Sequence, residues 1–145
     1  AYSDTALGNY LAYQSAKTSL KAKEKEVINL VVSQVNGCDY CLAAHTAIGK
    51  MNGFTEEQIL EIRTGSASFD ARLHALATFV KATTINRGRP DAEAVTQLLA
   101  SGFNKGNLVD ILLVISDKIV MNYLHNITEV PVDFPAAPAL DEATV

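Results

Sequence analysis

The dipeptide Asn36-Gly37 separates two helix-forming segments, and it constrains the fold more strongly than any other feature of the sequence. Residues 21–36 carry valines on one stripe with the spacing of a helix, although their β-branched content resembles that of a strand. Residues 38–51 are good helix formers without proline. Because glycine readily ends a helix and the turn is short, we expect the two helices to form an antiparallel hairpin.

The rest of the chain continues this helical periodicity between glycine, proline and capping residues. Thr55 and Gln58, for example, form a capping box. Since no segment has the alternating pattern of a strand, we expect an all-α fold of one helical domain, residues 1–127. We expect the proline-containing tail, residues 128–145, to be extended, disordered or laid on a neighbouring subunit. The further helices expected cover residues 3–17, 55–64, 70–86, 91–100 and 104–126.

Composition excludes several classes of protein. The chain has 145 residues, of which 48% are hydrophobic, enough for one domain with a sizeable core. A net charge of −4 without a basic cluster gives no reason to expect a nucleic-acid partner. No signal peptide and no apolar run of membrane length is recognised, so no membrane partner is expected. Two cysteines this close together cannot cross-link a secreted fold, so we expect a functional pair in the cytoplasm.

The stretch from Gly37 to His45 holds both cysteines of the chain, Cys38 and Cys41, in a Cys-x-x-Cys motif. On a helix, these two residues and His45 fall on one narrow face. The unpaired N–H groups and positive dipole of a helix start favour thiolates, and an imidazole can exchange a proton with them. These are the properties of a redox-active dithiol, although the charge of Asp39 opposes ionisation.

Three other interpretations of the motif are weaker. Cysteines in a helix can be small buried apolar residues. A zinc site usually needs four ligands, and only one cysteine pair is present, so we expect no metal and no cofactor. A thioredoxin-like domain also places Cys-x-x-Cys at a helix start, but it requires a β-sheet.

Glu26 and His45 lie at nearly the same level of the expected hairpin, about 16 Å and about 12 Å of helix from Gly37. They meet if they face each other. Without that contact, Glu26 is a solvated acid in a first helical turn. His74 and His125 are interpreted as structural, since a histidine near a helix end, as His125 is, interacts favourably with the dipole.

Residues 108–115 are apolar nearly all round the expected last helix, interrupted only by Asp110. Such a helix is buried within its domain or between subunits.

Glu26, Cys38, Cys41 and His45 together reproduce the pattern Glu-x11-Cys-x-x-Cys-x3-His. This pattern resembles the alkylhydroperoxidase D branch of the carboxymuconolactone decarboxylase family. Four residues at fixed spacing are far more specific than a lone Cys-x-x-Cys. The resemblance is strong over residues 23–53.

The resemblance implies an all-α homo-oligomer, commonly a trimer or hexamer, that reduces hydroperoxides in antioxidant defence. It implies that Cys41 is the attacking thiol and Cys38 the resolving thiol, whereas helix geometry alone leaves the two sulfurs undecided. Glu26 and His45 would form the proton relay. The expected partners are a hydroperoxide substrate and a dithiol reductant, which in the best-known members is a lipoylated acyltransferase.

Tyr40 departs from the family pattern, because the best-known members carry a histidine between the cysteines. A phenol is far less basic, which affects peroxidase efficiency more than dithiol–disulfide cycling. Two alternatives stay open. One is a decarboxylase-branch enzyme of the same fold, which does not depend on a Cys-x-x-Cys. The other is a redox-sensing or metal-binding module without turnover.

Overall fold

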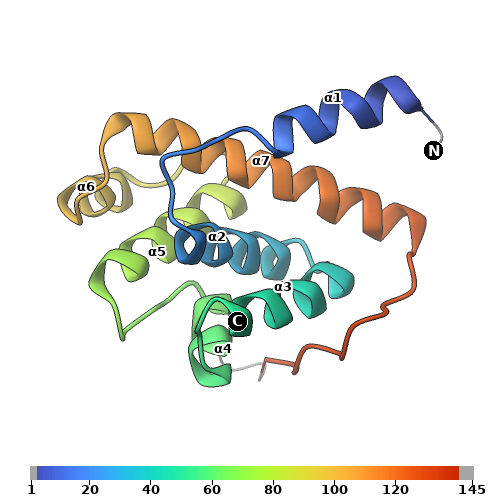
Figure 1. Ribbon diagram of the computed structural model, residues 1–145. Coiled ribbons are helices and arrows are strands. Elements are labelled where there is room, and N and C mark those ends of the chain that lie inside the picture. Colours follow the sequence, from blue (N-terminus) through green and yellow to red (C-terminus); the bar gives the residue numbers. More distant parts are fainter. Residues whose placement is uncertain (1–2, 141–145) are drawn as a thin grey trace.

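The computed structural model describes residues 3–140, which form seven α-helices and no strand (Figure 1). The all-α prediction is confirmed, and each expected helix is present with bounds that differ by only a few residues at either end. The helices are α1 (Asp4–Gln14), α2 (Ala22–Val35), α3 (Asp39–Met51), α4 (Glu56–Arg63), α5 (Ala71–Ile85), α6 (Ala92–Ala100) and α7 (Lys105–Thr128).

Local sequence signals set these boundaries. The predicted capping box is present at α4, where Thr55 accepts the amide of Gln58 and Gln58 returns a bond to the Thr55 amide. Gly37 has a positive φ of 60°, the left-handed conformation that ends α2 and lets α3 begin at once. The α2–α3 hairpin is therefore confirmed.

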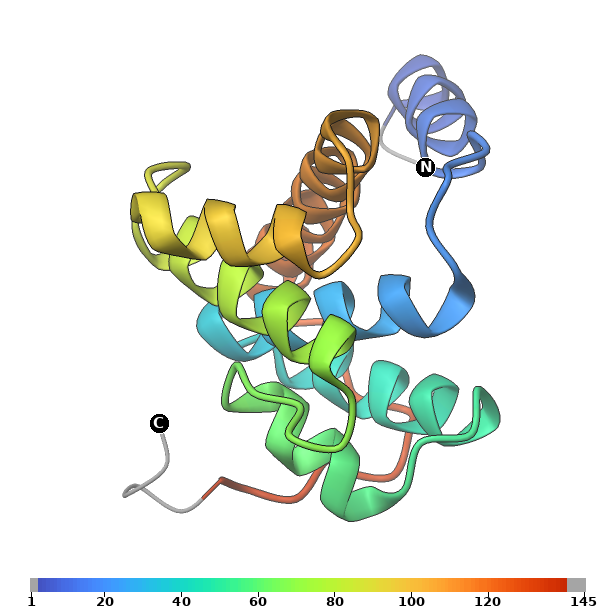
Figure 2. The ribbon, with the colours of Figure 1, turned by 90° about the vertical axis from the view of Figure 1, so that its left-hand side faces the viewer.

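Helix α2 is the centre of the fold and contacts α3, α4, α5 and α7 (Figures 1 and 2). Five of its apolar side chains are fully shielded from solvent, and each contributes about 1.5–3 kcal/mol through burial. Because α2 is enclosed by four other helices, it holds the side chains that it carries in fixed positions. The five shielded side chains are Val27, Ile28, Leu30, Val31 and Val32.

Helix α1 lies beside α7 and stands apart from the other helices (Figure 2). None of its residues is buried. It is held to α7 by hydrogen bonds, in which Tyr10 donates to Asp117 at 2.6 Å and Tyr13 donates to the carbonyl of Leu113. The helical spacing of this segment was predicted, but its apolar side chains do not join the core.

After α7 the chain turns at Glu129, in the left-handed conformation, and runs back past the start of α3 towards α4 (Figure 1). The segment is extended, and Arg63 donates a hydrogen bond to the carbonyl of Pro138 at 2.6 Å. It thus lies against its own chain, while residues 141–145 of the predicted tail lie outside the described residues. The division into a domain and a tail stays a prediction.

Among residues 3–140, no single helix is both long and apolar enough to cross a membrane. Only α6 and α7 taken together meet the criteria of length and composition, and they are bent by 117° at their junction.

Candidate functional site

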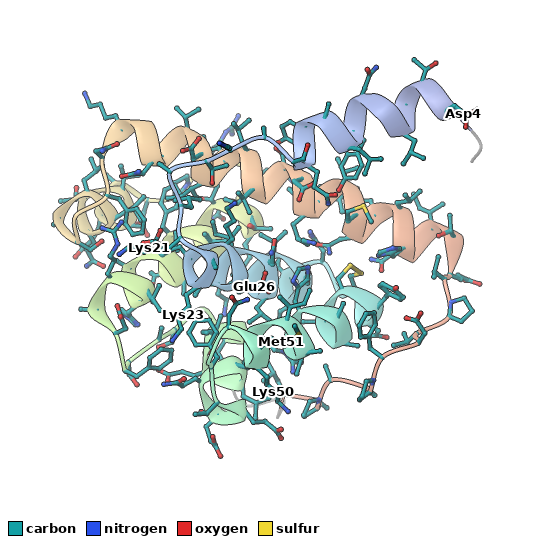
Figure 3. All side chains as sticks on the ribbon, viewed as in Figure 1. Asp4, Lys21, Lys23, Glu26, Lys50 and Met51 are labelled. Carbon is teal, nitrogen blue, oxygen red and sulfur yellow. A yellow bond between two sulfur atoms is a disulfide. The ribbon has the colours of Figure 1, made fainter. Side chains whose placement is uncertain are left out.

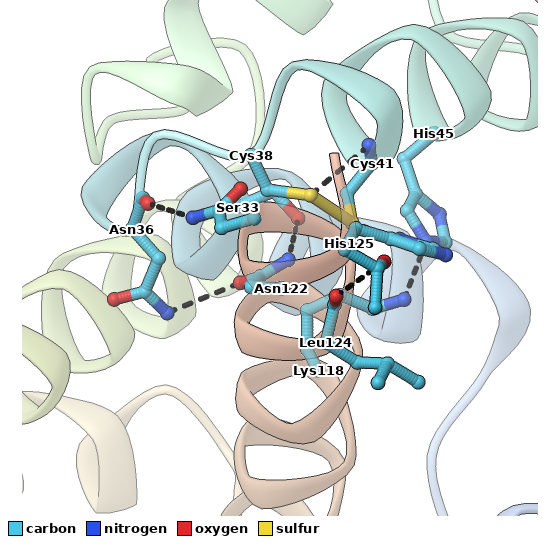
Figure 4. The surroundings of a disulfide bond; sticks show 11 residues. Ser33, Asn36, Cys38, Cys41, His45, Lys118, Asn122, Leu124 and His125 are labelled. Carbon is cyan, nitrogen blue, oxygen red and sulfur yellow. Dashed lines mark hydrogen bonds between the residues drawn. A yellow bond between two sulfur atoms is a disulfide. The ribbon is translucent and has the colours of Figure 1, made fainter. Parts of the chain in front are cut away.

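The two cysteines lie at the amino end of α3, as expected, and are joined by a disulfide. Cys38 is the N-cap residue, and its sulfur accepts the amide hydrogen of Cys41 at 3.3 Å (Figure 4). Both residues are almost fully buried. The amide and the helix dipole stabilise negative charge on sulfur, so this is a favourable place for a thiolate.

Glu26 projects from α2 towards α3, where its Oε2 lies 2.8 Å from His45 Nδ1 (Figure 3). The predicted meeting of these two residues is confirmed. Glu26 is buried, and its second oxygen accepts a hydrogen bond from Asn29 at 3.1 Å. It is therefore not a solvated acid at a helix start.

Lys118 of α7 lies on the other side of His45, so that Glu26, His45 and Lys118 form a row. Sequence reasoning missed Lys118. Its Nζ lies 2.7 Å from His45 Nε2 (Figure 4), and the residue is only 6% exposed. His45 thus lies between the side chains of Glu26 and Lys118, one at each ring nitrogen. Burial lowers the pKa of Lys118, against the opposing effect of Asp117 and Glu26.

The histidine in contact with a cysteine is His125 of α7, whose Nδ1 lies 3.3 Å from Cys41 Sγ (Figure 4). Burial first, and then the charge of Lys118, lower the pKa of His125. At neutral pH the ring is therefore uncharged and able to accept a proton. The interpretation of His125 as a helix-end residue had missed this contact.

Helix α7 is fixed over the α2–α3 turn by asparagine side chains (Figure 4). The fully buried Asn122 donates to Ser33 Oγ and accepts from Asn36 Nδ2, both at 3.1 Å. Asn126 donates to the carbonyl of Asn36 at 3.0 Å. Because His125 lies between these two anchors in sequence, its position above Cys41 is determined by the turn that also sets the start of α3.

A signal for this side of the site existed in the sequence. Lys118, Asn122 and His125 are spaced by four and three residues, so they lie along one stripe of the last helix. A buried polar stripe requires polar partners.

Tyr40 covers the outer side of His125. The two ring centroids are 4.4 Å apart, and Phe134 of the C-terminal segment packs edge-on against Tyr40 at 5.7 Å. Partial burial first, and then Asp133, raise the pKa of Tyr40, so its phenol stays protonated at neutral pH. Tyr40 thus orients the histidine ring and cannot serve as the base.

Two cavities flank the start of α3. One, of about 200 Å³, is bounded by Tyr40, His125 and residues of the 126–132 segment. The other, of about 530 Å³, is bounded by Leu42, Arg63 and residues of the 132–140 segment. The segment after α7 therefore forms one wall of both cavities, and neither cavity is bounded by Cys38 or Cys41 themselves.

Comparison with known proteins assigns the family. Residues 4–82 match the carboxymuconolactone decarboxylase family. The chain belongs to this family. The matched region contains α1–α4 and most of α5, and with them Glu26, both cysteines and His45, whereas Lys118 and His125 lie beyond it.

The alkyl hydroperoxide reductase AhpD of Mycobacteroides abscessus is 38% identical to this chain over 55 residues. The match covers 38% of this chain and 31% of that protein. The chain thus aligns with about a third of the length of this relative.

Solved structures share the fold over nearly the whole chain. A protein of unknown function from Agrobacterium tumefaciens, provisionally assigned as the antioxidant defence protein AhpD, superposes with a TM-score of 0.80 at 23% identity. The superposition covers 92% of this chain and 94% of that one. The debrominase Bmp8 in complex with 2,3,4-tribromopyrrole gives 0.72 at 15% identity, covering 89% and 70%. At these identities the likeness concerns the fold alone.

Proposed function

We propose that this protein is a thiol-dependent hydroperoxidase that acts in antioxidant defence by cycling Cys38 and Cys41 between dithiol and disulfide. The observation that carries the proposal is the position of Cys41. Its sulfur lies in the first turn of a helix, forms a disulfide with Cys38 and lies 3.3 Å from Nδ1 of His125. Membership of the family and the match to an alkyl hydroperoxide reductase support the same chemistry.

In the first step, the Cys41 thiolate attacks the O–O bond of the hydroperoxide. His125 accepts the thiol proton and returns it to the departing alkoxide, so that Cys41 becomes a sulfenic acid and an alcohol leaves. In the second step, Cys38 loses its proton and its thiolate attacks the Cys41 sulfur, so that the disulfide forms and the expelled hydroxide takes up that proton and leaves as water. The amide of Cys41 stabilises the thiolate that this step requires.

Glu26 and His45 act beside this pair as the proton relay. Both ring nitrogens of His45 are occupied, by Glu26 and by Lys118, whereas the contact with Cys41 is made by His125. We therefore assign direct proton transfer at sulfur to His125. The row Glu26–His45–Lys118 then holds the charge that keeps His125 neutral and exchanges protons with the site.

The disulfide must be reduced by an external dithiol, for which a lipoylated protein is the proposed partner. A dithiol breaks the protein disulfide through a mixed disulfide and then releases itself by forming its own internal disulfide. Because both cysteines are almost fully buried, this step requires Tyr40 or the 129–140 segment, which border the cavities beside the α3 start, to move aside.

The proposal is tested by a peroxidase assay with hydrogen peroxide and an organic hydroperoxide. Dihydrolipoamide, glutathione and thioredoxin are compared as reductants, and Cys41→Ser protein is the control. We expect catalytic peroxide consumption with dihydrolipoamide and none in the control. A protein that forms its disulfide once but never turns over would be a redox sensor. Dithiol-dependent consumption of 2,3,4-tribromopyrrole without peroxidase activity would assign a dehalogenase instead.

We also propose that the protein is a homo-oligomer, a trimer or hexamer. The outer face of α7 exposes large apolar side chains that a single protomer leaves in water. Exposed apolar area of this extent is typical of a surface that another copy covers. The side chains with at least two fifths of their surface exposed are Val109, Leu112, Leu113, Val120, Tyr123, Leu124 and Ile127.

A further inference from the structure

We propose that the dithiol form of the site binds one Zn²⁺ through Cys38 Sγ, Cys41 Sγ and His125 Nδ1. A fourth coordination position would remain open to water. The inference shares the reversible cysteine pair with the proposed peroxidase and adds a metal-bound resting state to it.

The positions of the ligand atoms carry the inference. The two sulfurs and a ring nitrogen of His125 all lie within 4.8 Å of one another. A tetrahedral zinc ion with ordinary bond lengths places two sulfurs about 3.8 Å apart and a sulfur and a nitrogen about 3.6 Å apart. Cys41 Sγ and His125 Nδ1, at 3.3 Å, are already close to that separation. Once the disulfide is reduced, the sulfurs can separate by side-chain rotation, because their Cα atoms are 5.3 Å apart.

The chemical character of the ligands also suits zinc. Thiolate and neutral imidazole are the ligands that zinc prefers, and both sulfurs lie where the helix start favours the thiolate. His125 is held in place by Tyr40 on its outer side and by the asparagine anchors of α7. Such supporting contacts fix the orientation of a ligand ring.

The positive charge of Lys118 does not exclude a cation here. Two thiolates neutralise Zn²⁺, so the complete site carries no net charge. Lys118 is itself linked through His45 to the carboxylate of Glu26. The requirement for a second cysteine pair, which the sequence does not meet, applies to closed structural sites. Sites with three protein ligands and one open position are typical of zinc that is exchanged or catalytic.

Zinc and the disulfide exclude each other, because both use the same sulfur electrons. Binding releases two protons when both cysteines start as thiols. Oxidation of the zinc form by one hydroperoxide consumes two protons and gives the disulfide, an alcohol, water and free Zn²⁺. The two thiolates lose two electrons, and the O–O bond gains them. Zinc would therefore protect the dithiol while peroxide is low and would leave when the pair is oxidised.

The test is a titration of the full chain, reduced and metal-free under anaerobic conditions, with Co²⁺ and with Zn²⁺. Cobalt is followed by its thiolate charge-transfer absorption, and zinc by competition with a chromophoric chelator. We expect one ion per chain in the dithiol protein and none in the disulfide protein. His125→Ala should weaken binding by at least about 10-fold, since even changes to groups that only support a ligand cost this much. The matched control His74→Ala changes an exposed helical histidine outside the site and should bind as the wild type does.

Absence of saturable binding by the dithiol protein, or wild-type affinity in His125→Ala, would overturn the inference. If His125→Ala does not fold, as judged by circular dichroism, Cys38→Ser replaces it and should lose the charge-transfer absorption. The zinc-free protein is assayed in parallel for peroxide turnover. Stoichiometric zinc without turnover would remove the proposed peroxidase and leave the zinc site, whereas turnover without zinc binding would do the reverse.

Discussion

The two sides of Cys41 are built in different ways. On the inner side, Glu26, His45 and Lys118 form a closely hydrogen-bonded row in which opposite charges balance. On the outer side, Tyr40 and His125 are partly exposed and border a cavity. The inner side holds the residues proposed as a proton relay, whereas the outer side makes the contact with sulfur. The two histidines therefore have different surroundings: His45 lies between the charged side chains of Glu26 and Lys118, and His125 contacts the sulfur of Cys41.

The largest loss of activity is expected from substitution of either cysteine, because both sides of the site act on this pair. Cys41→Ser and Cys38→Ser should each reduce multiple-turnover peroxide consumption to the buffer background, because the cycle needs both sulfurs. The measurement is steady-state peroxide consumption with excess dithiol. If either variant kept more than a small fraction of the wild-type rate, the dithiol cycle would not be the reaction.

His125→Gln should slow the single-turnover reaction of reduced protein with peroxide by about 100-fold, as the loss of a general base typically does. Stopped-flow kinetics at neutral pH measure this rate. His74→Gln is the control and should react as the wild type does. Equal rates for wild type and His125→Gln would show that the contact with Cys41 has no role in proton transfer.

His45→Gln and Glu26→Gln should slow the same step by a smaller factor than His125→Gln does, because these residues act through the charge balance of the site and not at sulfur. As the two residues form one row, the double variant should be no slower than the slower single variant. If His45→Gln proved slower than His125→Gln, the assignment of the two sides would have to be exchanged. That outcome would restore His45 as the direct proton acceptor of Cys41.

The smallest effect is expected from Lys118→Met, which tests whether the charge on the inner side changes the pKa of His125 on the outer side. Lys118 is the second cause, after burial, of the lowered pKa of His125. Lys118→Met removes a positive charge, so protonation of His125 becomes easier and its pKa should rise. The acid limb of the rate–pH profile should then move to higher pH. NMR titration of the His125 ring checks the shift, and an unchanged pKa would show that the two sides are electrically independent.

The proposed oligomer involves a different surface of α7, its exposed apolar face. Leu112→Asp and Leu113→Asp place charges on the proposed interface, at positions that are each 43% exposed in the protomer. Light scattering at micromolar concentration should give a mass of at least two protomers for the wild type and a lower mass for the variants. A strictly monomeric wild type would contradict the proposed oligomer.

The inner side was largely predictable because it follows from local rules. A helix, a glycine stop and a second helix fix which residues of the hairpin lie at the same level, so the meeting of Glu26 and His45 could be predicted from their distances to Gly37. The start of α3 at Cys38 followed from the same stop. Caps and glycines predicted the other helix boundaries in the same way.

The outer side could not be predicted because it depends on how distant helices pack. His125 lies 84 residues from Cys41 in the chain, and Lys118 lies 73 residues from His45. Periodicity predicts that α7 exists and is apolar, but not which of its faces meets α3. The spacing of Lys118, Asn122 and His125 places them on one stripe of α7, but it does not show whether that stripe is buried or what it contacts.

The central claim is that Cys41 is the sulfur that attacks peroxide and that His125 assists it. The most direct measurement is sulfenic-acid trapping by dimedone, located by mass spectrometry, after one equivalent of hydrogen peroxide is added to reduced Cys38→Ser protein. We predict dimedone on Cys41, formed at close to the wild-type rate of peroxide consumption and about 100-fold more slowly when His125→Gln is added. Rapid sulfenic-acid formation on Cys38 in Cys41→Ser protein, with none on Cys41 in Cys38→Ser protein, would contradict the account.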